Sequence, residues 1–329
     1  MTVTRKLCEK IVATATDDMG EAAIAKARQL VLDGVAVAVA GARIEEAPKI
    51  LADYLGAQGS KPECSALGFG FRLAPVPAAL LNATSMHVLD FEPMWTPATH
   101  ALSPALAPSL ALAESIGANG RDVLAAVIKG VEIQGWIRRA CGHVASRDFK
   151  FHPPGMVGPI GAAVAASHLL KLDASALANA IGIATSRCGS LTSNTGTMTK
   201  STHCGYAASL GLESALLAAH GFTGDDESFD SANGYAAIFL PPHFDREMLM
   251  SFGPPFRVVD PGFALKIFPC KFATHYGVTA ALAARSRLPS LDAIRAVRML
   301  APVVPTSDRP RPRPGSKANS ACNIPLRRH

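Results

Sequence analysis

Residues 87–100 read HVLDFEPMWTPATH and interrupt two long apolar segments of the chain. Apolar residues recur at spacings of three and four on both sides, which predicts a helix before the stretch and another after it. Pro93 and Pro97 favour a loop between the two helices. This loop carries acidic, aromatic and basic side chains: Asp90, Glu92, Trp95 and His100. A break of this kind suits either a plain connection between helices or a place for chemistry.

The same helical spacing continues outward over most of the chain. The predicted helices cover residues 1–12, 19–42, 49–55, 74–89, 103–115, 120–139, 158–170, 175–186 and 205–220. Residues 1–220 show no series of alternating strands and no fixed-period repeat. The sequence therefore predicts a mainly α fold.

The later part of the chain changes in character. Residues 66–70 are predicted as a short extended piece, and 291–304 as a strand-forming run. We expect a large all-α domain at residues 1–265 and the start of an α+β domain at 266–304, which the family resemblance described below makes a lid. Residues 305–329 are rich in Arg and Pro, lack an apolar period, and are predicted to be a disordered basic tail.

Composition excludes several classes of protein. Of the 329 residues, 49% are hydrophobic and only 18% are charged, which argues for a packed core. The net charge of +6 lies mostly in residues 305–329, which contain six Arg or Lys residues and one acidic residue. The rest of the chain carries about +1, so it offers no basic surface for nucleic acid. The most apolar run, residues 30–42, is too short for a membrane span. Seven cysteines without a CxxC pair favour a reducing, cytoplasmic location.

Polar clusters recur where predicted helices begin or end. Besides Asp90 and His100, they contain imidazole, ammonium and hydroxyl groups: His152, Lys200, His203, Lys266, Cys270, Lys271 and His275. We expect His152, Lys200 and His203 to precede helix N-termini, where backbone N–H groups and the helix dipole favour an anion. Lysine and histidine donors in such places suit a ligand that bears carboxylates.

Each of these residues also has a plain structural interpretation. Asp90 can end a helix, His152 can belong to a loop before Pro-Pro, Lys200 can be solvated, and Trp95 can be a packing residue. The chain has no HxxxH or HExxH pattern for a metal and no GxSxG elbow for a serine hydrolase. The GxG at residues 68–70 lacks the rest of a nucleotide-binding pattern and indicates a simple turn.

Four segments, taken in order, resemble the signatures of the MmgE/PrpD family, which includes 2-methylcitrate dehydratase, cis-aconitate decarboxylase and related epimerases. Residues 87–115 (HVLDFEPMWTPATHALSPALAPSLALAES) resemble its first signature, HALDFDDTH…HPS…PA…LAEA. The other three are FHPPGMVGPIGAAVAASHLLKLD at 151–173, GTMTKSTHCGYAASLGLESALLAAHGFTG at 196–224 and KIFPCKFATHYGVTAAL at 266–282.

The resemblance implies a homodimer whose active site lies between a helical domain and a lid, with no metal or organic cofactor. It implies a lyase that removes a proton or CO2 next to a carboxylate of a small di- or tricarboxylic acid. By motif, the catalytic candidates are Asp90, His100, His152 and Lys200; the substrate-binding candidates are His203, Lys266 and His275. In this scheme Lys200 and the helix start behind it hold a carboxylate, His100 and His152 share the general acid and base roles, and Asp90 orients one histidine.

The sequence departs from the family pattern in two places. This chain reads DFEPM at residues 90–94 where many relatives read DFDDT, which indicates a different substrate preference. Relatives continue well beyond the point where the Arg/Pro tail begins, so the resemblance predicts a C-terminally truncated member with a partial lid. The alternatives are then a catalytically impaired helical protein or an isomerase or epimerase of the same family.

Overall fold

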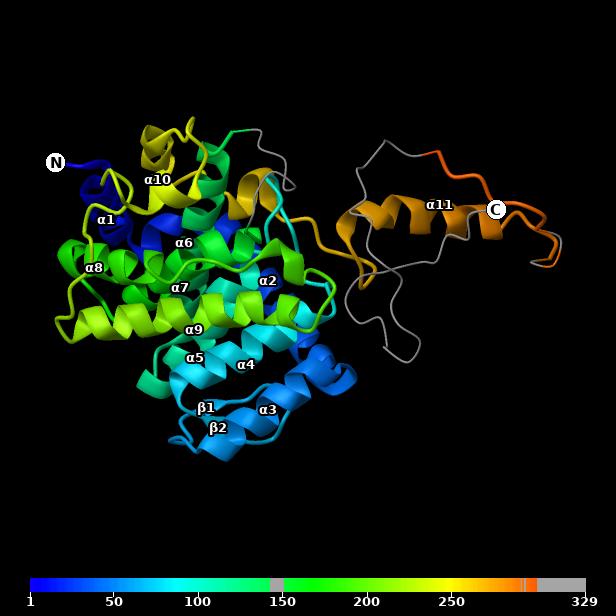
Figure 1. Cartoon of the computed structure of the whole chain (residues 1–329), viewed down its shortest axis with the longest axis horizontal. Helices are drawn as coiled ribbons and strands as arrows, with labels where there is room; N and C mark the ends of the chain where they lie inside the picture. The colour runs from blue at the N-terminus through cyan, green and yellow to red at the C-terminus, as the bar shows by residue number, and fades with distance from the viewer. Residues whose placement is uncertain (143–150, 291, 293, 301–329) are drawn as a thin grey trace.

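The computed structural model describes residues 1–142, 151–290, 292 and 294–300, and these form a mainly helical molecule (Figure 1). The helices are α1 (Val3–Ala13), α2 (Gly20–Ile44), α3 (Glu46–Gln58), α4 (Pro75–Val88), α5 (Leu102–Ile116), α6 (Gly120–Ala140), α7 (Pro153–Leu169), α8 (Ala174–Thr185), α9 (Thr199–Ala219), α10 (Tyr235–Phe239) and α11 (His275–Arg285). The mainly α fold class predicted from the sequence is confirmed.

Two helices rich in small residues form the centre of the body. α7 and α9 run side by side there, with α4, α5 and α6 packed around them (Figure 1). A Cβ atom placed on Gly211 would lie 2.2 Å from the backbone oxygen of Pro159 and 2.4 Å from the Cβ of Ala162. The two backbones therefore touch, which the small side chains of residues 162–166 permit. α7 is buried along almost its whole length, so its polar N-terminal end is held in a fixed place.

A few helix boundaries differ from the prediction, and the differences matter for the site. α7 begins at Pro153 instead of residue 158, because proline is well tolerated in the first turn of a helix. α9 begins at Thr199 instead of residue 205, since the apolar period starts only after a polar first turn. Lys200 and His203 accordingly lie within the helix, and the expectation that they precede it is wrong.

Extended structure is scarce among the described residues. The extended piece predicted at 66–70 is in fact the turn of a small antiparallel hairpin, β1 (Cys64–Ser65) paired with β2 (Arg72–Leu73). Residues 294–300 form no strand, so the strand-forming run predicted at 291–304 is wrong there. Residues 291, 293 and 301–304 lie outside the described residues, as does the tail predicted to be disordered at 305–329.

The final described helix stands apart from the body. α11 lies to one side of it in Figure 1, and its side chains are largely exposed apart from His275. The α+β lid domain predicted at 266–304 therefore stays a prediction. The six cysteines in the described part of the chain are all free. No helix among the described residues has both the length and the apolar character needed to cross a membrane.

Candidate active site

The break after α4 is a tight turn that folds Asp90 back over the helix end. The backbone N–H of Asp90 donates to the carbonyl of His87 at 3.0 Å, and Asp90 itself has a φ of 50°. This left-handed conformation is uncommon for a residue with a Cβ atom, and aspartate is one of the residues that tolerates it best. The turn places the Asp90 carboxylate among groups from three other parts of the chain.

Asp90 is surrounded by two ammonium groups and an imidazole. The Lys266 ammonium donates to Oδ1 of Asp90 at 2.8 Å and to its backbone oxygen at 2.5 Å. Nζ of Lys200 lies 3.6 Å and Nε2 of His100 lies 3.7 Å from the same Oδ1. Burial alone would raise the pKa of Asp90, but Lys200, His100 and Lys266 together hold it below its usual range. Asp90 is therefore a buried anion.

Lys266 reaches this place because its segment is paired with the loop after α4. Met94 and Ala264 exchange both backbone hydrogen bonds, at 3.1 and 2.7 Å, in an isolated antiparallel bridge. The Lys266 side chain is completely buried. The first residue of the predicted lid segment thus contacts the helical body directly.

A second carboxylate, Glu92, joins two of the histidines. Its Oε1 lies 3.1 Å from Nδ1 of His87 and 3.0 Å from Nδ1 of His100, and its Oε2 accepts from the backbone N–H of Ser103 at 3.2 Å. Burial would raise the pKa of Glu92, yet the contacts with His100 and His87 lower it below its usual range. Burial, reinforced by Lys200 and His100, lowers the pKa of His87 to about 3, so its imidazole is neutral.

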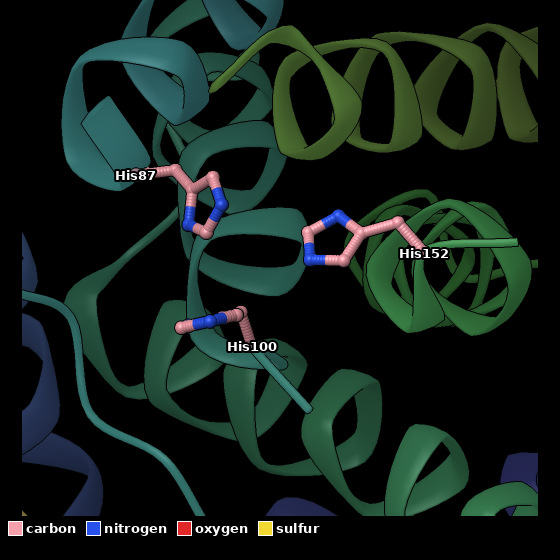
Figure 2. A group of neighbouring side chains, drawn as sticks. All are labelled: His87, His100 and His152. Carbon is pink, nitrogen blue, oxygen red and sulfur yellow. The ribbon is translucent and has the colours of Figure 1, made fainter. Parts of the chain in front are cut away.

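The third histidine stands at the start of α7. His152 is the residue before the first turn of α7, and its Nδ1 lies 3.1 Å from Nδ1 of His203 on α9. Burial, with help from His87, His100 and Lys200, lowers the pKa of His152 well below its usual value. In Figure 2 the rings of His87, His100 and His152 face one another, and the ring centroids lie 4.5 to 6.2 Å apart. These side chains form one connected polar cluster inside an apolar body.

Comparison with known proteins identifies this architecture. The MmgE/PrpD N-terminal domain matches residues 5–247. The chain belongs to the MmgE/PrpD family. The cis-aconitate decarboxylase of Mus musculus is 31% identical over 292 residues, which cover 87% of this chain and 59% of that protein. The cis-aconitate decarboxylases of Homo sapiens and Aspergillus terreus are 34% and 27% identical, over 73% and 88% of this chain and 52% and 61% of those proteins. The chain thus spans little more than half the length of these relatives.

The structure brings together six of the seven residues singled out by the family signatures. They come from the loop after α4, the N-terminal ends of α7 and α9 and the segment after residue 262. The six residues are Asp90, His100, His152, Lys200, His203 and Lys266. In this member of the MmgE/PrpD family, residues separated by more than 170 positions therefore meet at Asp90.

His275, the seventh residue, lies elsewhere. It starts α11, its ring packs against Phe268 and Phe272 at centroid distances of 5.2 and 5.3 Å, and its Nε2 is buried. None of the contacts described for His275 involves a residue of the cluster. The expectation that it sits beside the other candidates is not met in this arrangement of the chain.

The sequence did not single out His87, and Glu92 was named in the loop without an assigned role. His87 lies in the last turn of an apolar helix, and Glu92 stands beside a proline in a loop. The available signal was their place inside the 87–100 stretch, where His87 and Glu92 flank Asp90. Trp95 is a packing residue, in agreement with the structural interpretation given from the sequence. Its ring stacks on that of Phe263 at a centroid distance of 4.4 Å, and the residue is 4% exposed.

Proposed function

We propose that this protein is a cofactor-independent lyase that decarboxylates a small unsaturated tricarboxylic acid such as cis-aconitate. The observation that carries the proposal is the meeting of Lys200, His100 and His152 around two buried carboxylates in an MmgE/PrpD domain. The names of the relatives favour cleavage of a carbon–carbon bond over dehydration or epimerisation.

The ammonium of Lys200 is the group we assign to a substrate carboxylate. It lies at 3.6 Å from Asp90, while Lys266 already makes both short contacts with that residue. The backbone N–H groups of Lys200 and Ser201 donate to carbonyl groups of their own turn, so the side chain and not the helix end supplies the contact. We therefore assign Lys266 to holding Asp90 in place.

The geometry also separates the two catalytic histidines. His100 stands between Glu92 and Asp90, at 3.0 and 3.7 Å, so both of its nitrogens face carboxylates. Among the described residues, His152 makes its polar contact through Nδ1, toward His203, and Figure 2 shows its other nitrogen turned toward His87 and His100. We assign proton delivery to His152 and substrate positioning to His100.

The reaction needs one proton for each CO2 released. The bond between a carboxyl carbon and its neighbour breaks, and the electron pair left behind spreads into the remaining conjugated carboxylate. A proton from solvent then reaches carbon through the neutral imidazole of His152, which takes up one proton at one ring nitrogen and releases another from the other nitrogen. A fixed ammonium group stabilises the developing charge without the reorganisation that water would need.

The test is proton NMR of the purified chain incubated with cis-aconitate and with 2-methylcitrate in the presence of a chelator. We expect loss of CO2 from the unsaturated acid, and a fall in turnover of 10²-fold or more in His152→Ala and in Lys200→Ala. The exposed residues His220 and Lys26 supply matched controls, His220→Ala and Lys26→Ala, which should keep full turnover. Unchanged turnover in both site variants would refute the assignment.

We also propose that the protein is a cytoplasmic homodimer. The free cysteines support a reducing compartment, and the family resemblance supports the dimer. Light scattering of the purified chain measures its mass in solution, and a monomeric mass would contradict the dimer.

A further inference from the structure

Three imidazole rings from distant parts of the chain converge on one point. His87 comes from α4, His100 from the loop before α5, and His152 from the start of α7. Each offers a ring nitrogen, and these three nitrogens lie within 4.8 Å of one another. Figure 2 shows the ring of His152 turned toward His87 and His100, with the ring of His100 seen edge-on below that of His87.

Within the described part of the chain, two of these rings have a nitrogen without a hydrogen-bond partner. Glu92 faces Nδ1 of His87 at 3.1 Å, which leaves Nε2 of His87 free, and that atom is fully buried with no partner. Nδ1 of His100 is also buried without a properly oriented partner, although Glu92 lies 3.0 Å away. A buried nitrogen that lacks a partner is costly, so a group that binds it is expected to stabilise the fold.

The surroundings resemble those of a metal site more than those of a plain core. A carboxylate that accepts from one nitrogen of a histidine orients the ring and makes the other nitrogen a better ligand, and Glu92 stands in that relation to His87. The charges of Lys200 and Lys266 oppose a cation, but the carboxylates of Asp90 and Glu92 balance them. The buried thiol of Cys204 lies within the same distance of His87 and Glu92, in a second group of possible ligands that shares only His87 with the first.

We propose that His87, His100 and His152 form a binding site for one divalent transition-metal ion of the zinc type. Neutral imidazole is a preferred ligand of Zn²⁺, Co²⁺ and Cu²⁺, and three of them with an open fourth position make a tetrahedral site. At Zn–N distances of 2.0–2.1 Å the ligand nitrogens would lie about 3.4 Å apart, so the rings must close by roughly 1.4 Å at most. His152, the least buried of the three, has the most room to move.

An ion bound here would act as an inhibitor. It would occupy the nitrogen of His152 that we assign to proton delivery, and it would fill the space in front of His100. This consequence for activity rests on the proposed function, whereas the binding itself does not. The experiment therefore measures binding without any substrate, so that it succeeds or fails independently of the reaction.

The probe is Co²⁺, which gives intense visible absorption bands when it is tetrahedrally coordinated. The full chain, freed of metal with a chelator and dialysed, is titrated with Co²⁺ and then with Zn²⁺. We expect about one Co²⁺ per chain with a tetrahedral spectrum, and its displacement by Zn²⁺. His87→Ala and His152→Ala should each weaken binding at least 100-fold, and Glu92→Gln about 10- to 100-fold. The control His220→Ala, at an exposed position, should bind as the parent does.

Two results would overturn the proposal: the absence of tetrahedral bands in the parent protein, or bands that persist unchanged in both His87→Ala and His152→Ala. Circular dichroism of each variant reports whether it folds. If His87→Ala does not fold, His152→Ala decides the question, since His152 is only partly buried and its removal disturbs the core least.

Discussion

Glu132 on α6 offers the sharpest test of the electrostatics of this fold. Its carboxylate is completely buried and accepts from the backbone N–H of Arg257 and from Nε1 of Trp136, both at 2.6 Å. Burial raises the pKa of Glu132 to about 7 from its ordinary value of 4.5, and the two donors only partly oppose that shift. The folded protein thus holds a proton here that the unfolded chain has already released at mildly acidic pH.

The sign and size of the effect follow from this difference. Between pH 4.5 and 7 the folded state binds more protons at Glu132 than the unfolded state does, so the free energy of unfolding falls as the pH rises. A shift of this size corresponds to about 3 kcal/mol, at 1.36 kcal/mol per pKa unit. The stabilisation is fully present below pH 4.5 and is lost above pH 7.

The assay is urea unfolding of the parent and of Glu132→Gln at several values between pH 4.5 and 8, followed by circular dichroism. Glutamine has the shape of protonated glutamate and does not titrate. At pH 4.5 we expect the free energy of unfolding of the variant to be equal to that of the parent or lower. By pH 8 we expect it to have risen by about 3 kcal/mol relative to that of the parent. A difference between the two proteins that stays constant across this range would refute the reasoning.

Two further predictions concern packing and the buried ion pair. Lys266→Met removes both short contacts of Asp90 and leaves the Lys200 ammonium at 3.6 Å, so we expect the free energy of unfolding in urea to fall by about 3–5 kcal/mol. Asp90→Asn in the same chain should restore part of that loss, and an equal loss in the single and double variants would contradict this. Gly205→Ala would place a Cβ atom 2.2 Å from Oγ1 of Thr84, so we expect the melting temperature to fall with a loss of about 1–3 kcal/mol. The matched control Gly56→Ala, with nothing within 4 Å, should be neutral or stabilising, and a similar fall in both variants would count against close packing at Gly205.

The helical part of this fold was readable from local patterns. The apolar spacing predicted helices over 103–115 and 120–139, and the structure has them at Leu102–Ile116 and Gly120–Ala140. Such segments succeed because each turn of a buried helix repeats the same local requirement for apolar residues. The starts of α7 and α9 failed because their first turns are polar or rich in proline, so the apolar period begins later than the helix itself.

The sequence likewise identified some residues of the site and not others. The family signatures named Asp90, His100, His152 and Lys200, and the fold places them in one cluster. They did not name His87, because a histidine at the end of an apolar helix looks like any other buried residue until its neighbours are known. The absence of HxxxH spacing likewise says nothing about histidines that come together from three separate parts of the chain.

By itself, the sequence determined the fold class, the family and most of the residues that carry charge into the core. Only the tertiary structure decided which of those residues touch, that Lys266 serves Asp90, that Glu92 joins two histidines and that His275 stands apart. The physical reason is distance along the chain: helix formation depends on neighbours three and four positions away, whereas the contacts at Asp90 depend on packing between α4, α9 and a segment 176 residues later.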